Sequence, residues 1–458
     1  MRTSSGREDR KRVSGARSTS AALRSTRAAA AALALGTSAC SDSATVLETS
    51  GQQANPAEGT GPAGGGEATP GEGVDTAQTG SLYAMTVHAF GPDSTTSYLV
   101  TVPSLEEGNL MDLDTAIELP DYANVGGISG EPFVWLGYSN SPTVERWDLD
   151  ASGRFVRGPT LSFANLGASS VSPDAQGAFI SRELAAVPNQ DTGELIFWNP
   201  TSMEIVGSLD LEIPERDGVP PLVRSTTARP DGTLLLSYYY LSAEGRFVDV
   251  AGIVVVDPSG PSVLGRDEWE GCNYNYARDA ADGTVYLTVN ASWIQGRLVY
   301  PDGGPWVATP CLLRVLPGAT EFDRGFVPEV LSGLAGGRQI TGNLEPTSER
   351  EAFFVAWQDE LVTAELTPEN FDDMRYTIPA YKWYLWDIVG AQAVEVPGEP
   401  FAALPEINVV DGRMWYSDQR LAGDNGGLGV VPFYELTPTG PKPAFIGFGT
   451  TWYMVRVR

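Results

Sequence analysis

A sequence motif of two parts recurs seven times along this chain of 458 residues. The first part is an Asp-Gly turn followed by an apolar run, as at 231–237, 282–288 and 411–417. The second part is an apolar run that ends in a Pro, Gly or Asp turn, as at 255–258 and 197–200. Asp-Gly before β-forming residues is a strong hairpin signal, because Gly adopts positive φ at little steric cost. Each copy therefore predicts a small antiparallel sheet.

The spacing of the copies indicates how these sheets are arranged. The first parts lie near residues 81, 131, 174, 231, 282, 350 and 411. The mean step of about 55 residues suits a propeller blade of four strands with its loops. Nearly continuous apolar runs such as Leu234–Leu236 are typical of strands covered on both faces. We expect an all-β fold in which residues 81–458 form a single β-propeller, with seven blades of four antiparallel strands. Six or eight blades, or a β-sandwich, are the alternatives.

The two ends of this region also fit a closed ring. Ser81–Phe90 and Thr450–Arg458 are both apolar segments with strand character. We expect strands from the two ends to pair within one blade, because closure removes exposed sheet edges.

The N-terminal segment resembles an export signal. Residues 1–39 carry a long basic region and then a short apolar stretch, Ala28–Gly36, too short to span a bilayer. Thr37–Cys40 resembles a bacterial lipobox, so we expect residues 1–39 to be a lipoprotein signal peptide and Cys40 to be lipidated. An ordinary signal peptide with an incidental cysteine is the alternative. Residues 40–80 are rich in Gly, Pro, Ala and Thr, which predicts a disordered tether. We therefore expect an exported protein, anchored by lipid in the bacterial envelope or at the cell surface, with no other membrane contact.

The net charge of −28 bears on the choice of partner. Cleavage after residue 39 would make it more negative, because the signal region is basic. Such a surface repels nucleic acid and anionic lipid, so we expect no nucleic-acid partner. The charge can also serve only to keep an exported protein in solution.

The remaining cysteines are Cys272 and Cys311. An even pair in an oxidising compartment predicts a disulfide, and two buried free thiols are the alternative. No metal site is predicted, because acidic residues such as Asp279 and Asp282 lack the spacing of a known calcium loop and fit a solvated rim equally well.

The sequence carries no catalytic constellation. A Ser-His-Asp triad would need the one histidine, His88, and the chain has neither a G-x-S-x-G elbow nor a phosphate-binding loop. We predict no catalytic residue and no cofactor, and we expect His88 to be structural, near the ring closure. The protein is therefore predicted not to be an enzyme.

Aromatic residues cluster in three places, 238–240, 274–276 and 381–386. Candidate ligand contacts are Tyr274, Tyr276, Arg278, Trp383 and Trp386, because Tyr and Trp on a propeller face make good contacts and Arg suits an anionic ligand. Packing between blades is the alternative for the aromatic side chains.

Three stretches carry a family resemblance: Leu161–Asn165, Phe197–Ile205 and Trp383–Asp387. Together with the lipobox and tether they resemble extracytoplasmic YVTN/WD40-like propeller lipoproteins of myxobacteria and related bacteria, named after a protein of the myxochelin siderophore cluster. The resemblance implies a place in siderophore uptake, with a TonB-dependent receptor or another envelope protein as partner and a siderophore as ligand. It carries over no catalytic residue, because the shared motifs are structural turns and core strands.

The leading hypothesis is a non-enzymatic, lipid-anchored propeller that binds a partner protein or small ligand at the cell envelope. The alternatives are a lactonase-like propeller hydrolase with a central metal and a structural envelope protein.

Overall fold

The structure is a computed structural model. It describes residues 80–90, 95–111, 113–172, 176–273, 276–289, 296–300, 304, 307–309, 311–326, 333, 335–336, 341–371, 378–402, 406–417 and 429–458. The predicted signal peptide, Cys40 and all but the last residue of the predicted tether lie outside these residues.

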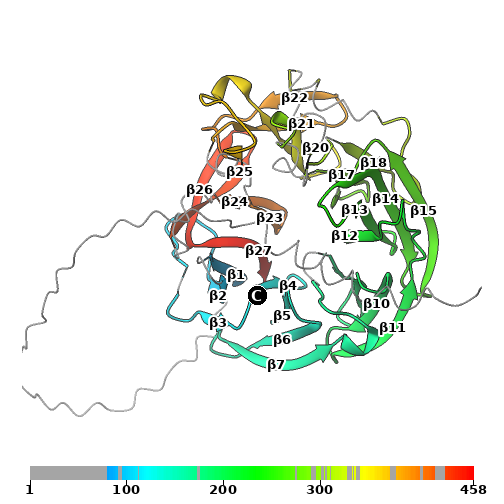
Figure 1. Cartoon of the computed structure of the whole chain (residues 1–458). Helices are drawn as coiled ribbons and strands as arrows, with labels where there is room; N and C mark the ends of the chain where they lie inside the picture. The colour runs from blue at the N-terminus through cyan, green and yellow to red at the C-terminus, as the bar shows by residue number, and fades with distance from the viewer. Residues whose placement is uncertain are drawn as a thin grey trace, which may run out of the picture. The chain divides into compact units, whose positions relative to one another are not determined.

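Seven antiparallel sheets form a ring around a central axis (Figure 1). The first blade contains β1 (Tyr83–Phe90), β2 (Thr95–Val102) and β3 (Ile117–Leu119), and the second contains β4 (Ala123–Gly126), β5 (Phe133–Tyr138), β6 (Thr143–Leu149) and β7 (Phe155–Ser162). The third contains β8 (Ala178–Phe179), β9 (Ala185–Asn189), β10 (Glu194–Asn199) and β11 (Glu204–Asp210), and the fourth contains β12 (Pro221–Ala228), β13 (Leu234–Leu241), β14 (Phe247–Asp257) and β15 (Ser262–Glu270).

The remaining blades follow in chain order. The fifth contains β16 (Tyr276–Asp279), β17 (Val285–Thr288) and β18 (Leu312–Val315), which are three strands among the described residues. The sixth contains β19 (Thr341–Pro346), β20 (Glu351–Trp357), β21 (Tyr381–Asp387) and β22 (Gln392–Glu395). The seventh contains β23 (Glu406–Val410), β24 (Arg413–Ser417), β25 (Val430–Thr437) and β26 (Gly440–Phe448), and β27 (Thr450–Arg456) ends the chain. The prediction of a seven-bladed all-β propeller is confirmed.

Within a blade the strands run from the axis outward in chain order (Figure 1). The second strands are largely buried, β5 and β13 along their whole length, whereas the outermost strand β11 is largely exposed. This gradient explains the sequence pattern, because a second strand is covered by two neighbouring blades and an outermost strand by none. The hydrophobic cores accordingly lie between blades, where for example Leu235 and Ile253 of the fourth blade share a cluster with Leu287 and Leu313 of the fifth.

One copy of the repeat occupies a different place in its blade. Six of the seven first parts lie on or directly before a second strand, but the one near residue 174 precedes β8, the innermost strand of the third blade. The second strand of that blade is β9, which follows a Ser-Arg-Glu turn at 181–183. This turn lacks the Asp-Gly signal. The sequence pattern therefore indicated the position near residue 174, before β8, instead of the turn before β9.

The ring closes as predicted, with strands from both ends in one blade. β27 supplies the innermost strand of the first blade and pairs with β1, so that Tyr83 lies opposite Arg456. The backbone N–H of Leu82 donates to the carbonyl of Arg458 at 3.1 Å, and Val457 donates to Leu82 at 2.8 Å. Residues 80–82 and the C-terminus therefore lie side by side.

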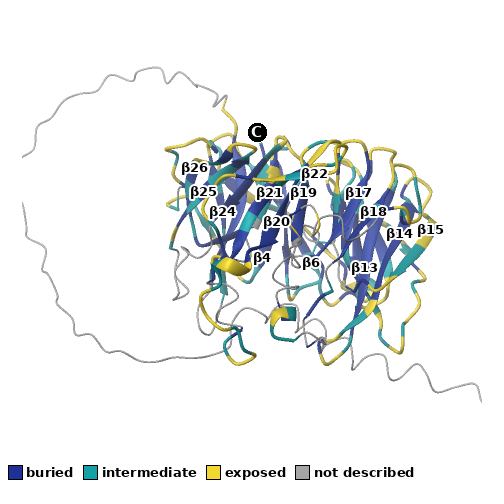
Figure 2. Cartoon of the chain, turned by 90° about the horizontal axis from the view of Figure 1, so that it is seen from above, coloured by how far each residue is buried: buried dark blue, intermediate teal, exposed yellow. Residues whose placement is uncertain are grey.

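The strand alternation gives the ring two distinct faces (Figure 2). The turn face carries the turns between first and second and between third and fourth strands, such as Asp231–Gly232 and Asp257–Gly260. The insert face carries the connections between second and third strands. The two chain ends lie on the turn face, where Nη1 of Arg456 donates to Asp411 in the turn before β24. No helix among the described residues has the length and apolar character to cross a membrane.

Candidate functional site

The inner edges of the fifth and sixth blades bring three charged side chains close together. Arg278 and Asp279 end β16, and Glu345 lies near the end of β19. Nε of Arg278 donates to Oε1 of Glu345 at 2.6 Å. Both strands are innermost in their blades, so this ion pair joins two blades beside the axis. We call these three residues the axial ion cluster.

A bulge in β19 positions Glu345. The register of β19 against β20 shifts between Gly342 and Glu345. Asn343 lies within the shift with a φ of 48°, a left-handed conformation that Asn tolerates better than most residues. Its backbone N–H donates to the carbonyl of Val289 in the fifth blade at 3.2 Å. Bulges turn side chains away from the regular pleat, and this one sets the direction of Glu345 toward Arg278.

The cluster has unusual electrostatics for carboxylates. Burial raises the pKa of Glu345 above its usual value, with the neighbouring Arg278 acting in the opposite direction and Asp279 raising it further. Desolvation also raises the pKa of Asp279, although this residue is exposed to solvent.

The chemistry open to this arrangement follows from its charges. Two carboxylates beside one guanidinium leave an excess of negative charge, and a raised pKa lets a carboxyl hold its proton closer to neutral pH. The cluster can therefore exchange protons or attract a cationic group. Among the residues that the structure describes, no three His, Cys, Asp or Glu side chains converge as a metal site would require.

The two predicted aromatic contacts whose side chains the structure describes, Trp383 and Trp386, are core residues rather than members of this cluster. Trp383 and Trp386 lie in β21 and are both almost fully buried. Trp383 stacks on Phe401 at 5.2 Å between ring centroids, whereas Trp386 contacts Tyr286 edge-on at 6.0 Å. The two indoles belong to different core clusters, so the structure places them in the packing between blades, as in the alternative interpretation.

The structure describes the other predicted ligand residues to different extents. Tyr274 lies outside the described residues, and Tyr276 is described only as the first backbone position of β16, opposite Thr288. Arg278 is the one member whose side chain the structure places at an inner edge with part of its surface exposed. Its Nε donates to Glu345.

His88 is buried beside the ring closure. Its Nδ1 is hydrogen-bonded to Oγ of Ser97 at 2.9 Å, and its ring stacks on Tyr122 with centroids 4.4 Å apart. Ser97 also accepts the backbone N–H of Ala123, so the pair ties the first blade to the innermost strand of the second. Burial lowers the pKa of His88 to about 3, which keeps the imidazole neutral. These contacts favour the predicted structural role.

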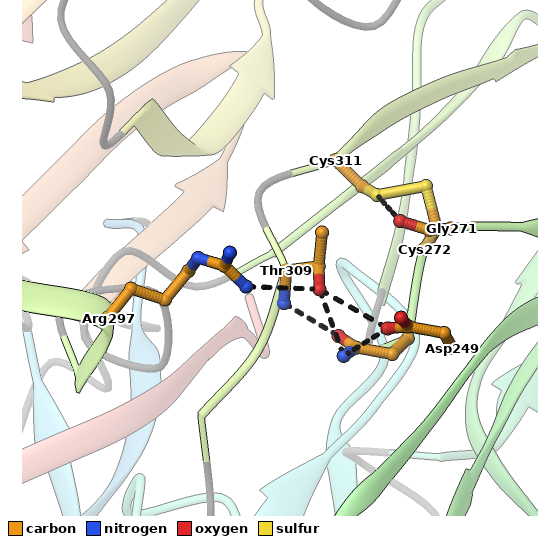
Figure 3. The surroundings of a disulfide bond; sticks show 7 residues. Asp249, Gly271, Cys272, Arg297, Thr309 and Cys311 are labelled. Atoms are coloured by element: carbon orange, nitrogen blue, oxygen red, sulfur yellow. Dashed lines mark hydrogen bonds between the residues drawn. A yellow bond between two sulfur atoms is a disulfide. The ribbon is translucent and has the colours of Figure 1, made fainter. Parts of the chain in front are cut away.

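The predicted disulfide between Cys272 and Cys311 is confirmed, with Sγ atoms 2.03 Å apart (Figure 3). Cys272 lies between β15 and β16, and Cys311 directly precedes β18, so the bridge lies on the insert face. Beside it, the side chain of Asn273 donates to Asp249 at 3.0 Å and to Oγ1 of Thr309 at 3.1 Å, and its Oδ1 accepts the backbone N–H of Thr309 at 2.7 Å.

The insert face is asymmetric around the ring. In the second, third and fourth blades the connection between second and third strands is short, as between β9 and β10. In the fifth, sixth and seventh blades it spans residues 289–311, 358–380 and 418–429. The described part of the sixth-blade connection packs Leu361 and Leu366 against the core and leaves Ala364 and Glu365 exposed. Three consecutive blades thus carry a long connection on the same face.

A small recess lies elsewhere on this face, between the third and fourth blades. It has about 80 Å³ of space and is lined by residues that include Asn189, Gln190, Asp210 and Pro221. The Gln190 amide donates to the Val223 carbonyl at 2.7 Å and accepts its N–H at 3.0 Å, which ties the third blade to β12. The recess has room for a few water molecules only.

Sequence reasoning missed Glu345 and the asymmetry of the insert face. Glu345 could have been noticed as an acidic residue within the strand Thr341–Pro346. Its pairing with Arg278 could not be predicted, because the order of the strands was not known. The long connections of the fifth and sixth blades were detectable in the sequence, because they lengthen the repeat steps that end near residues 350 and 411.

Comparison with known proteins adds little beyond these observations. No protein-family model and no curated protein matches the chain. Among solved structures, a candidate 6-phosphogluconolactonase from Bacteroides fragilis aligns with 10% identity and a TM-score of 0.48, over 84% of this chain and 99% of that one. The apo form of AztD from Citrobacter koseri aligns with 12% identity and a TM-score of 0.39, over 82% of this chain and 98% of that one.

Proposed function

We propose that this protein is a non-enzymatic propeller that binds a partner protein or small ligand through its insert face at the bacterial cell envelope. The observation that carries the proposal is that the fifth, sixth and seventh blades, which are adjacent, each carry a long connection between second and third strands on this face. Connections of this kind are tolerated because the strands beneath them keep the fold, and binding residues are found disproportionately on such loops.

The position of the chain ends supports the choice of face. Nε of Arg458 donates to the carbonyl of Gly80 at 3.0 Å, so the segment that precedes the ring leaves from the turn face. In this proposal residues 40–80 are a tether and Cys40 carries a lipid. An anchor attached there would leave the opposite face, with its long connections, free to meet a partner.

The finer assignment comes from the family resemblance. We propose a place in siderophore uptake, with a TonB-dependent receptor or another envelope protein as partner and a ferric siderophore as ligand. The strongly negative chain, with a net charge of −28, favours a partner with a basic surface.

A calorimetric titration with a ferric catecholate tests the ligand. We expect saturable binding at micromolar concentration, weakened at least tenfold by Ala364→Arg on the insert face. The matched control is Ala151→Arg, an exposed alanine in the turn between β6 and β7 on the turn face, which should bind like the unaltered protein. Equal weakening by both variants would contradict the choice of face, and no saturable heat would contradict the siderophore ligand.

The envelope location and the alternatives need separate measurements. Labelling with radioactive palmitate in a Gram-negative host should mark the protein and not its Cys40→Ala variant. Turnover of a lactone that depends on an added divalent cation would favour the hydrolase alternative. A protein that is anchored but binds neither a siderophore nor an envelope receptor would fit the structural alternative.

A further inference from the structure

Three separate segments of the chain meet beside the disulfide (Figure 3). They are the start of β14 in the fourth blade, the link between β15 and β16, and the end of the connection between β17 and β18. Asp249 belongs to the first, Cys272 and Asn273 to the second, and Thr309 and Cys311 to the third. The backbone N–H of Gly271 also donates to the carbonyl of Asp249 at 2.9 Å, which fixes the link against the fourth blade.

The connection between β17 and β18 is held at this point by two kinds of bond. The disulfide holds Cys311 covalently, and the Asn273 side chain holds Thr309 through both its backbone N–H and its Oγ1. Nη1 of Arg297, farther back in the same connection, donates to Oγ1 of Thr309 at 3.4 Å. The disulfide fixes the position of Cys311, and the hydrogen bonds of Thr309 form next to it.

The surroundings of the sulfur atoms allow the bond to break without loss of the fold. Cys272 and Cys311 are buried in the same core cluster as Leu241, Ala251 and Ala308. A free cysteine in such a place behaves as a small apolar side chain. Two thiols would therefore keep most of the packing of the bridge, while the covalent tie to the connection would be lost.

We infer that the disulfide and Asn273 form a redox-operated latch, which fastens the connection between β17 and β18 to the fourth blade when oxidised and releases it locally when reduced. In the reduction, a dithiol gives two electrons and two protons to the bridge; the S–S bond breaks, two cysteine thiols form, and the dithiol becomes a cyclic disulfide. The latch holds part of the insert face, so its consequence for ligand binding rests on the proposed function, whereas the release itself does not.

Hydrogen–deuterium exchange on the whole chain tests the latch. Peptides that cover residues 296–309 report on the connection, and peptides that cover β5 and β6 in the second blade serve as the internal reference. After reduction with dithiothreitol we expect exchange in the first set to become at least tenfold faster, with the reference unchanged, because local opening no longer works against a covalent tie. No ligand is present, so the result is independent of whether the proposed binding is found.

Variants separate the latch from other effects of the reagent. Cys272→Ala/Cys311→Ala should exchange at the fast rate without dithiol and should not respond to it. Asn273→Ala, which keeps the bridge, should stay slow until it is reduced. If the cysteine variant does not fold, the test is the comparison of the unaltered protein before and after reduction. Equal protection in both redox states would overturn the inference, and so would a uniform acceleration in all blades, because the bridge would then stabilise only the fold as a whole.

Discussion

At the scale of single residues, burial decides the charge of the one histidine. The pKa of His88 is lowered to about 3 by desolvation, whereas an unfolded chain would protonate it near 6.5. Between these values the unfolded chain binds the proton and the folded chain does not. The contribution of His88 to stability is therefore complete above pH 6.5 and is lost as the pH falls toward 3.

This difference predicts a pH dependence that a variant can isolate. Between pH 7 and pH 4.5, His88 should lower the free energy of unfolding by about 2–3 kcal/mol, and His88→Gln should lack this part of the pH dependence. Urea denaturation of both proteins at the two pH values measures it, with the carboxylates contributing alike to each. The same slope in both proteins would mean that His88 is protonated in the folded state.

Gly252 is a second residue whose role is local. It lies opposite Tyr238 across β13 and β14, and a Cβ on Gly252 would stand 2.0 Å from Cζ of the tyrosine ring. The ring is buried and its hydroxyl donates to Glu268, so it has no free space to move into.

We therefore expect Gly252→Ala to destabilise the fold by about 3 kcal/mol or more through overpacking. Gly207 in β11 is the matched control, because a Cβ there would meet nothing within 4 Å, and Gly207→Ala should change stability by less than about 1 kcal/mol. Thermal unfolding followed by circular dichroism measures both. A mild effect of Gly252→Ala would show that the tyrosine can leave its position.

At the scale of elements, the axial ion cluster joins two innermost strands. Removing the guanidinium with Arg278→Ala leaves Glu345 buried without its partner, and we expect a loss of about 2–3 kcal/mol, reduced by the partial exposure of the arginine. The double variant Arg278→Ala/Glu345→Gln should recover part of the loss, because an amide costs less to bury than a carboxylate. Denaturation at neutral pH compares the three proteins, and a double variant no more stable than the single one would argue against an unpaired charge as the cause.

The elements also show how far sequence reasoning reaches. Asp-Gly turns and apolar runs are local signals, so second strands such as β13, β17 and β24 could be predicted closely. β9 could not, because its turn lacks that signal. Trp383 and Trp386 illustrate a different limit: a dense aromatic segment fits a binding face and a core equally well, and only the neighbouring blades decide between them. The pairing of Arg278 with Glu345 depends on strand order, which a single strand does not encode.

At the scale of the whole molecule, stability depends on the ring being closed. β27 is the innermost strand of the first blade and lies between β1 and the neighbouring blades, with contacts to β4 and β23. The C-terminal nine residues therefore complete the first blade and also contact the blades on both sides of it.

Deletion of residues 450–458 tests this dependence. We expect the shortened chain to lose cooperative unfolding and to aggregate, because β1 would present an open edge and buried residues such as Met85 would meet solvent. Adding the missing strand as a separate peptide should restore a monomer in part. Size-exclusion chromatography and calorimetry measure both effects, and an unchanged melting transition would mean that six blades hold the seventh in place without its inner strand.

The hydrogen bonds between Gly80, Leu82 and Arg458 have a practical consequence for protein engineering. Because these positions are neighbours, a linker of a few residues could join them, and new termini could be opened in the short connection between β9 and β10. The chain of such a circular permutant would begin and end on the insert face of the ring. A reporter domain fused there would lie on the insert face, whereas one fused after Arg458 would lie on the turn face.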